Sequence, residues 1–172
     1  QDELVFDGHS FALNKKGEIS HISNPFEESC DILDLNEIHS FELEKTNENE
    51  QLFNALCLGL KDYFFKTGHQ KAVIGLSGGI DSALTCAIAS IALGAKNVFG
   101  YALPSKFSSE HSIEDAKILA NNLGINFSEI SIKEIHNQFL DSLSNDMDVK
   151  TSSLALENLQ ARIRGNLLMA LS

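Results

Sequence analysis

The sequence has no long apolar run and few cysteines, and these two shortages exclude several classes of protein. No stretch approaches the roughly 20 uninterrupted apolar residues that a transmembrane helix needs, and no membrane partner is expected. The first residues, QDELVFDG, are acidic, so we expect no secretory signal there. The 3 Cys show no CxxC spacing, which favours reduced structural thiols in a cytoplasmic protein.

Positive charge is also scarce. The formal net charge is −11, from 24 acidic and 13 basic side chains. Residues 1–50 hold 13 of the acidic side chains and only 3 Lys, whereas residues 51–172 hold 11 acidic and 10 basic side chains. The first segment would repel a polyanion, so binding to nucleic acid is not expected. The asymmetry suggests two segments of different character, although an acidic run is usually only a solvated surface.

The first 44 residues have the pattern of short β-strands separated by turn residues. A lone hairpin is hardly stable in water, so this segment is expected to belong to a larger sheet. A polar stretch, KTNENE, then resembles a linker. We expect strands at 5–6, 10–13, 19–23 and 30–35, a turn at 15–18 and the linker at 45–50.

From residue 51 onward, strand and helix patterns alternate. Short apolar runs suited to buried strands are followed by segments with helical spacing of apolar residues. This alternation predicts an α/β fold, with a parallel sheet covered by helices on both faces. We expect strands at 72–76, 97–103 and 127–132, and helices at 52–64, 83–93, 133–143 and 154–171, with one more between a capping box at Ser112–Asp115 and Gly124.

The most informative motif is SGGIDS at 77–82, between the first strand of the α/β part and its helix. The paired glycines allow a sharp turn and close approach of a ligand, and the amides of the helix start favour an anion. Ser77 and Ser82 add uncharged hydroxyls. Asp81 would repel a phosphate unless a divalent cation lay between them, and Mg²⁺ commonly binds one or two carboxylates together with phosphate oxygens. The motif therefore predicts a site for a magnesium-bound polyphosphate.

Other interpretations of this loop remain open. A tight turn without a ligand leaves two Gly, two Ser and an Asp unexplained. The run Gly75 to Gly79 also fits the G-x-S-x-G nucleophile elbow of serine hydrolases, with Ser77 as nucleophile and His111 or His136 as a possible base. Asp81 and Ser82 have no role in that scheme. A Walker A motif is excluded because the required Lys is absent.

SGGIDS resembles the phosphate loop of the N-type ATP pyrophosphatases, which split ATP between the α and β phosphates. Several synthetases and tRNA-modifying enzymes share this loop, so another ATP-pyrophosphatase amidotransferase remains an alternative, as does a non-catalytic nucleotide-binding module. The stretches 103–109 with 114–125, and ENLQARIRGNLLMALS at 157–172, are similar to segments of glutamine-dependent NAD synthetases. The resemblance covers most of 51–172 and implies the adenine-nucleotide alpha-hydrolase-like fold.

The resemblance implies a ligase that amidates deamido-NAD to NAD through an adenylate, with ATP as co-substrate, Mg²⁺ as cofactor and ammonia derived from glutamine. It implies a homo-oligomer, Asn158 and Arg162 as deamido-NAD contacts, Asp81 as metal ligand, and no catalytic residue beyond the ATP and metal site. Residue types alone would instead place Arg162 and Arg164 on a solvated helix face. Lys106 stands where many relatives have Arg. The implied ATP and pyrophosphate contacts are Gly75, Leu76, Ser77, Gly78, Gly79, Ile80, Asp81 and Ser82.

The first segment, QDELVFDGHSF, is similar to the closing strands of the nitrilase-type glutaminase domain of the long NAD synthetases. The catalytic Glu, Lys and Cys of that domain lie upstream in the family, so none of the three Cys is expected to be the nucleophile. Since the chain also stops inside a helical pattern, we expect a fragment, inactive by itself. The expected organisation is a glutaminase tail and β-hairpin remnant at 1–44, a linker at 45–50 and a truncated synthetase domain at 51–172.

Overall fold

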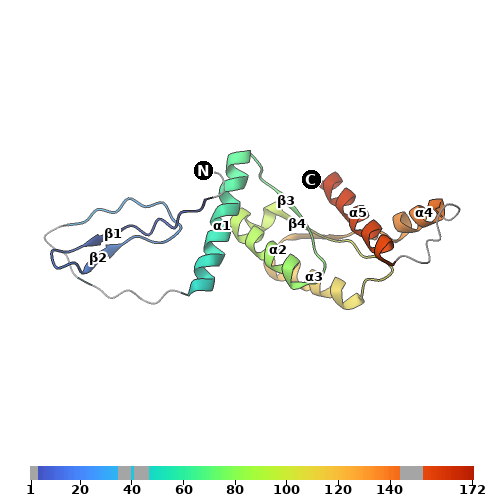
Figure 1. Cartoon of the computed structure of the whole chain (residues 1–172), viewed down its shortest axis with the longest axis horizontal. Coiled ribbons are helices and arrows are strands. Elements are labelled where there is room, and N and C mark those ends of the chain that lie inside the picture. The colour runs from blue at the N-terminus through green and yellow to red at the C-terminus, as the bar shows by residue number, and fades with distance from the viewer. Residues whose placement is uncertain (1–3, 35–39, 41–46, 144–152) are drawn as a thin grey trace. The chain divides into compact units, whose positions relative to one another are not determined.

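The computed structural model describes residues 4–34, 40, 47–143 and 153–172. The chain divides into two compact units, Gln1–Thr67 and Gly68–Ser172 (Figure 1). None of the helices in the described ranges combines the length and hydropathy that a bilayer-spanning segment requires.

The first unit contains the expected hairpin. Strands β1 (Phe11–Leu13) and β2 (Ile19–Ile22) pair antiparallel. The side chain of Asn14 stabilises the turn between them, because its Oδ1 accepts hydrogen bonds from the backbone amides of Lys16 and Glu18 at 2.9 and 3.0 Å. A short polar side chain that bonds to its own turn is typical of such positions.

The strands expected at 5–6 and within 30–34 are absent, so these two predictions are wrong; residue 35 lies outside the described residues. The second stretch is held through a side chain rather than a backbone ladder. The carboxylate of Asp31 accepts a hydrogen bond from Ser23 Oγ at 2.6 Å and lies 3.0 Å from His21 Nε2. Residues 30–34 therefore alternate in polarity without forming a strand. Side-chain bonds from Asp31 to His21 of β2 and to Ser23 hold this stretch in place of backbone pairing.

Helix α1 (Glu48–Thr67) ends the first unit and begins within the stretch expected as a linker. Asn47 starts it, since its Oδ1 accepts a hydrogen bond from the amide of Asn49 at 3.0 Å. Glu48 and Glu50 in the first turn favour this end of the helix electrostatically. Gly68, with φ of 76°, follows the last residue. The assignment of residues 1–44 to a glutaminase domain and of residues 51–172 to a synthetase domain stays a prediction.

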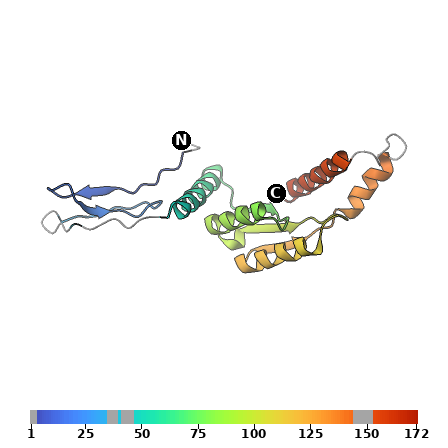
Figure 2. The same cartoon turned by 60° about the horizontal axis from the view of Figure 1, so that its bottom comes forward.

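The second unit is an α/β layer structure, as predicted (Figure 2). Its sheet has three parallel strands in the order β3-β4-β5, and each strand is joined to the next by a helix. Two more helices follow the last strand. The elements are β3 (Ala72–Gly75), α2 (Ile80–Leu93), a 3-10 turn (Ala95–Asn97), β4 (Val98–Ala102), α3 (Glu110–Leu123), β5 (Asn126–Glu129), α4 (Lys133–Leu143) and α5 (Ser153–Leu171).

Helices cover both faces of this sheet. Neighbouring strands follow one another in sequence, so right-handed crossovers place α2 and α3 on the same face, and these helices contact each other. Helix α5 contacts β3 and supplies Ile163 to a buried cluster with Leu103 and Ile132, against which Tyr101 of β4 packs. On β4 buried and half-buried residues alternate, as expected for a strand covered on both sides.

The start of α3 differs from the expectation. Ser109 is its N-cap, and the Oγ of Ser109 accepts a hydrogen bond from the amide of Ser112 at 3.1 Å. The capping box predicted at Ser112–Asp115 is therefore wrong, and the helix begins at Glu110. Ser109 and Ser112 are both residue types that can cap a helix. The hydroxyl of Ser109 is the one that accepts a hydrogen bond from a backbone amide of the first turn, so Ser109 is the cap.

Candidate nucleotide site

The motif SGGIDS lies where β3 ends and α2 begins, at the carboxyl edge of the parallel sheet. Crevices at this edge are the usual ligand sites of open α/β sheets. Leu76 is buried and continues the pairing, because its amide donates to the carbonyl oxygen of Tyr101 at 2.8 Å. Ser77, Gly78 and Gly79 then turn the chain, and Gly79 is the N-cap of α2 without a side-chain cap bond. The helix amides thus begin at an exposed loop.

Gly78 is required by the backbone at this turn. Its φ of 79° lies in the left-handed region, which side chains disfavour. A Cβ at this position would overlap the carbonyl oxygen of Ser112 and lie 2.7 Å from its Cα. The loop therefore packs directly against the first turn of α3.

We expect Gly78→Ala to destabilise the protein by about 2 kcal/mol, because left-handed strain and overlap with backbone atoms add. Gly124→Ala is the matched control, since Gly124 has φ of 68° but nothing within 4 Å of the added carbon. Urea unfolding of both variants measures the difference. Equal losses of stability would show that the contact with Ser112 is unimportant.

The two hydroxyls of the loop hold it together. Ser77 Oγ and Ser82 Oγ lie 3.1 Å apart, and Ser82 Oγ donates to the carbonyl oxygen of Gly79 at 2.9 Å. The amides of Ser77 and Gly79 donate to these hydroxyls at 3.3 and 3.2 Å. The latter bonds are long, so an anion could replace them without a large loss. The arrangement gathers amides and hydroxyls with no positive side chain in the loop itself.

Asp81 projects from the first turn of α2 and is exposed. No group of three metal-binding side chains occurs in the described part of the chain. A single carboxylate beside a phosphate loop nevertheless suits Mg²⁺, which keeps several waters and takes its other ligands from substrate phosphates. The donor set therefore fits a magnesium ion that arrives with a polyphosphate rather than one held by the protein alone.

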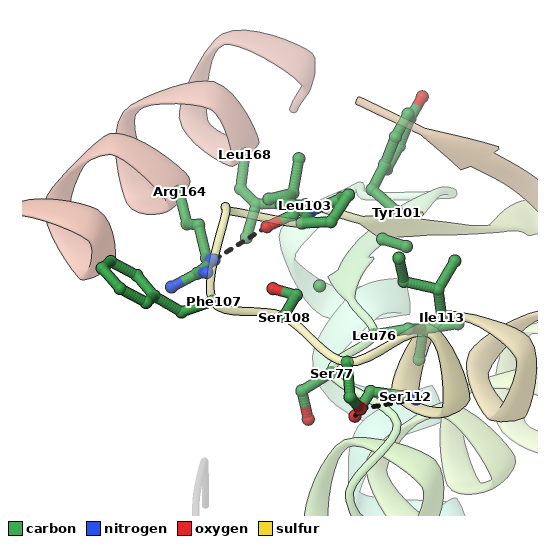
Figure 3. A pocket seen from close by; sticks show the side chains of 14 residues that line it. Leu76, Ser77, Tyr101, Leu103, Phe107, Ser108, Ser112, Ile113, Arg164 and Leu168 are labelled. Carbon is green, nitrogen blue, oxygen red and sulfur yellow. Dashed lines mark hydrogen bonds between the residues drawn. The ribbon is translucent and has the colours of Figure 1, made fainter. Parts of the chain in front are cut away.

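A cavity of about 550 Å³ opens beside the loop (Figure 3). Ser77 and Ser112 line one part of it, and Arg164 of α5 lines another. Its walls are mainly apolar with a few polar groups, as is usual for nucleotide and small-molecule sites. The lining residues are Gly75, Leu76, Ser77, Tyr101, Ala102, Leu103, Pro104, Phe107, Ser108, Ser109, Ser112, Ile113, Arg164 and Leu168.

The remaining loop residues face a different space. A smaller cavity of about 280 Å³ lies against α3. Its lining residues are Leu76, Gly78, Gly79, Ile80, Ser82, Ala83, Asp115, Ala116 and Leu119. Of the predicted contacts, Gly75 and Ser77 therefore line the larger cavity, and Gly78, Gly79, Ile80 and Ser82 line the smaller one. Leu76 lines both cavities, and Asp81 lines neither.

The two residues implied as deamido-NAD contacts lie elsewhere. Asn158 and Arg162 are both exposed on α5, and neither lines the larger cavity. Arg162 donates one terminal N–H to the backbone oxygen of Asn158 at 3.5 Å. Their role in substrate binding stays a prediction.

Arg164 was missed by sequence reasoning, which placed it on a solvated face. It is half-buried, and its Nε donates to the carbonyl oxygen of Leu103 at 2.9 Å. Burial lowers the pKa of its guanidinium. The signal was present in the spacing, since Gln160, Arg164 and Leu168 lie four residues apart on one helix face and two of them border the larger cavity.

No imidazole serves Ser77 among the described residues. The hydrogen-bond partners of Ser77 Oγ are Ser82 Oγ and the amide of Gly79. His111 is exposed, and neither His111 nor His136 lines the larger cavity. His136 is only 1% exposed, and its pKa is lowered by burial and by the charges of Lys106 and Arg164. The geometry therefore gives the nucleophile-elbow interpretation no support.

A family model described as NAD synthase matches residues 52–172. The chain is 46% identical over 178 residues to the glutamine-dependent NAD(+) synthetase of Synechocystis sp., covering 99% of this chain and 32% of the relative. It is 39% identical over 209 residues to that of Thermotoga maritima, covering 100% and 36%. The chain thus spans about a third of the length of these curated relatives.

Solved structures of NAD synthetases are also similar to this chain. The glutamine-dependent NAD+ synthetase from Acinetobacter baumannii, in complex with ADP, matches with a TM-score of 0.87 and 36% identity, over 100% of this chain and 34% of that one. The NH3-dependent NAD synthetase from Campylobacter jejuni matches with a TM-score of 0.65 and 31% identity, over 74% and 53%. The second of these proteins is described as NH3-dependent.

Proposed function

Since the chain belongs to the NAD synthase family, we propose that it is the nucleotide-binding part of a longer ligase that converts the carboxylate of deamido-NAD into the amide of NAD. The observation that supports this most directly is the loop SGGIDS at the sheet edge, beside a cavity of about 550 Å³. ATP is the co-substrate, and glutamine is the source of ammonia in the full-length protein.

In the proposed reaction, a carboxylate oxygen of deamido-NAD attacks the α-phosphorus of ATP, and pyrophosphate leaves. Ammonia then attacks the acyl carbon of the adenylate, and AMP leaves as the amide forms. Ser77, Gly78, Gly79 and Ser82 would hold the leaving pyrophosphate through amides and hydroxyls. Phosphoryl transfer is catalysed mainly by positioning and charge stabilisation, which is what such a loop offers.

Asp81 would hold the magnesium ion, which supplies positive charge against the pyrophosphate oxygens. Without it, the carboxylate and the phosphates would repel one another across a few ångströms. Gly75, Leu76 and the α5 residue Leu168 would contact the nucleoside, because they form apolar parts of the larger cavity.

We assign residues 1–44 to the tail of a glutaminase domain, 45–50 to a connection and 51–172 to the first part of the synthetase domain. We further propose a homo-oligomer in the cytoplasm. The cysteines carry their sulfur as thiols, which suits a reducing compartment.

An isotope experiment on the full-length protein tests the adenylate. With ATP, Mg²⁺, ammonium and deamido-NAD labelled with ¹⁸O in its carboxylate, one ¹⁸O should appear in the AMP released, because that oxygen bridges the acyl carbon and the phosphorus in the intermediate. Mass spectrometry of AMP gives the answer. AMP without label would exclude an acyl adenylate, and labelling of Ser77 by a fluorophosphonate would favour a serine hydrolase. ATP binding without pyrophosphate release would indicate a non-catalytic module.

A further inference from the structure

Arg164 stands where two cavities meet. A third cavity, of about 430 Å³, is lined by the segment that follows β4 and by α5. It shares Phe107, Ser108 and Arg164 with the larger cavity and adds Ser105, Leu156, Glu157 and Gln160. Figure 3 shows Arg164 reaching from α5 toward this segment, with Phe107 beside it. A group bound near the guanidinium would therefore adjoin both spaces.

The guanidinium is fixed in place. Its Nε donates to the carbonyl oxygen of Leu103, in a segment that is itself held by the hydrogen bond from the amide of Ile132 to the carbonyl oxygen of Pro104 at 2.9 Å. With Nε engaged, the two terminal nitrogens make no hydrogen bond to a described residue, so their N–H groups remain for another acceptor. Arg is suited to such double use, because its donors form a rigid planar fork.

Arg164 forms no ion pair with an acidic side chain in the described ranges. Glu157 lines the same cavity, and no ion pair joins it to Arg164. Nearby His136 experiences the positive charges of both Lys106 and Arg164, which together with burial lower its pKa. A half-buried cation without a counter-ion is costly, so an anionic ligand would stabilise this arrangement.

We propose that Arg164 is the residue that holds the carboxylate of the acceptor substrate at the junction of the two cavities, next to the nucleotide. This proposal rests on the proposed function, in which the acceptor substrate is deamido-NAD and carries its carboxylate on an aromatic ring. Phe107, which is 66% exposed, lies on the same shared wall. The Nζ of Lys106 lies 4.9 Å from the centroid of its ring, so a bound ring would stack on the other face. A guanidinium and a phenyl ring together are complementary to the charge and the ring of a pyridine carboxylate.

The test compares how tightly the full-length protein binds the acid, deamido-NAD, and the amide, NAD. Calorimetry gives both dissociation constants, and their ratio measures the preference for the acid. The unsubstituted protein should bind deamido-NAD about 10-fold more tightly than NAD, or better, given the usual strength of a charge-assisted bidentate contact. In Arg164→Gln this ratio should fall to near 1. Arg164→Lys keeps the charge but loses the fork, so its ratio should lie between the two. The KM for ATP should change less than threefold in both variants.

Two further variants complete the design. Lys117→Gln removes a positive charge from an exposed position on α3 and should leave the ratio unchanged. Arg162→Gln tests the rival residue on the same helix. A ratio that stays at its original value in Arg164→Gln overturns the proposal, as does a ratio that collapses in Arg162→Gln but not in Arg164→Gln. A larger effect on the KM for ATP than on deamido-NAD binding would assign Arg164 to the nucleotide instead. Because the ratio is a binding measurement, it can be obtained even if the ¹⁸O experiment fails.

Discussion

Asp81→Asn in the full-length protein is expected to lower turnover by about 100-fold or more, the usual loss when one preorganised electrostatic contact is removed. Asn keeps the shape of the side chain but lacks the charge that a magnesium ion needs. The folded structure should be unaffected, because Asp81 is exposed in the first turn of α2 and its backbone oxygen, not its carboxylate, accepts the bond from Thr85 at 2.9 Å. Steady-state rates of pyrophosphate release over a series of Mg²⁺ concentrations measure the effect.

Glu134→Gln is the control for this change, since Glu134 is an exposed acidic residue in the first turn of α4, outside the nucleotide site. Its rate should equal that of the unsubstituted protein. If Asp81 is a ligand, Asp81→Asn should also require a higher Mg²⁺ concentration for half-maximal rate. An unchanged rate at saturating Mg²⁺ would show that the carboxylate does not bind the metal.

The central part of the fold was predictable because local signals agreed. Short apolar runs separated by helical patterns identified β3, β4 and β5, and the Gly pair located the turn between β3 and α2. What spacing could not reveal is which atoms the turn touches. The requirement for Gly at 78 comes from the backbone of Ser112, 34 residues later in the sequence, and only the folded structure brings these residues together.

The errors have related causes. The stretch 30–34 alternates like a strand, yet Asp31 is held by side-chain bonds to residues on and beside β2, and a backbone partner cannot be read from polarity. Arg164 was placed on a solvated face because charged residues usually lie there. The carbonyl oxygen that fixes it belongs to Leu103, 61 residues earlier. Long-range contacts of this kind decide the site, and residue types alone carry no information about them.

A second large effect is expected when the first segment is removed. We predict that a full-length protein shortened to begin at Asn47 retains ammonia-dependent NAD synthesis and loses glutamine-dependent synthesis completely. Beginning at Asn47 keeps the start of α1, where the Oδ1 of Asn47 accepts from the amide of Asn49 and the amide of Gln51 donates to the carbonyl oxygen of Asn47 at 3.0 Å. The residues removed contain the hairpin β1–β2 and no phosphate loop, and under our assignment they belong with the glutaminase domain.

The measurement is NAD formation with ammonium or glutamine as nitrogen donor, on a protein whose helix content is checked by circular dichroism. Gly78, Ser77 and Asp81 all lie in the compact unit Gly68–Ser172, so the loop and the turn against Ser112 need no residue before Asn47. Glutamine-supported activity in the shortened protein would mean that the boundary between the two chemistries is misplaced. A folded protein inactive with ammonium would show that the synthetase site depends on the segment before Asn47. Because the two donors are compared on one sample, loss of folding would abolish both activities, whereas the predicted outcome separates them.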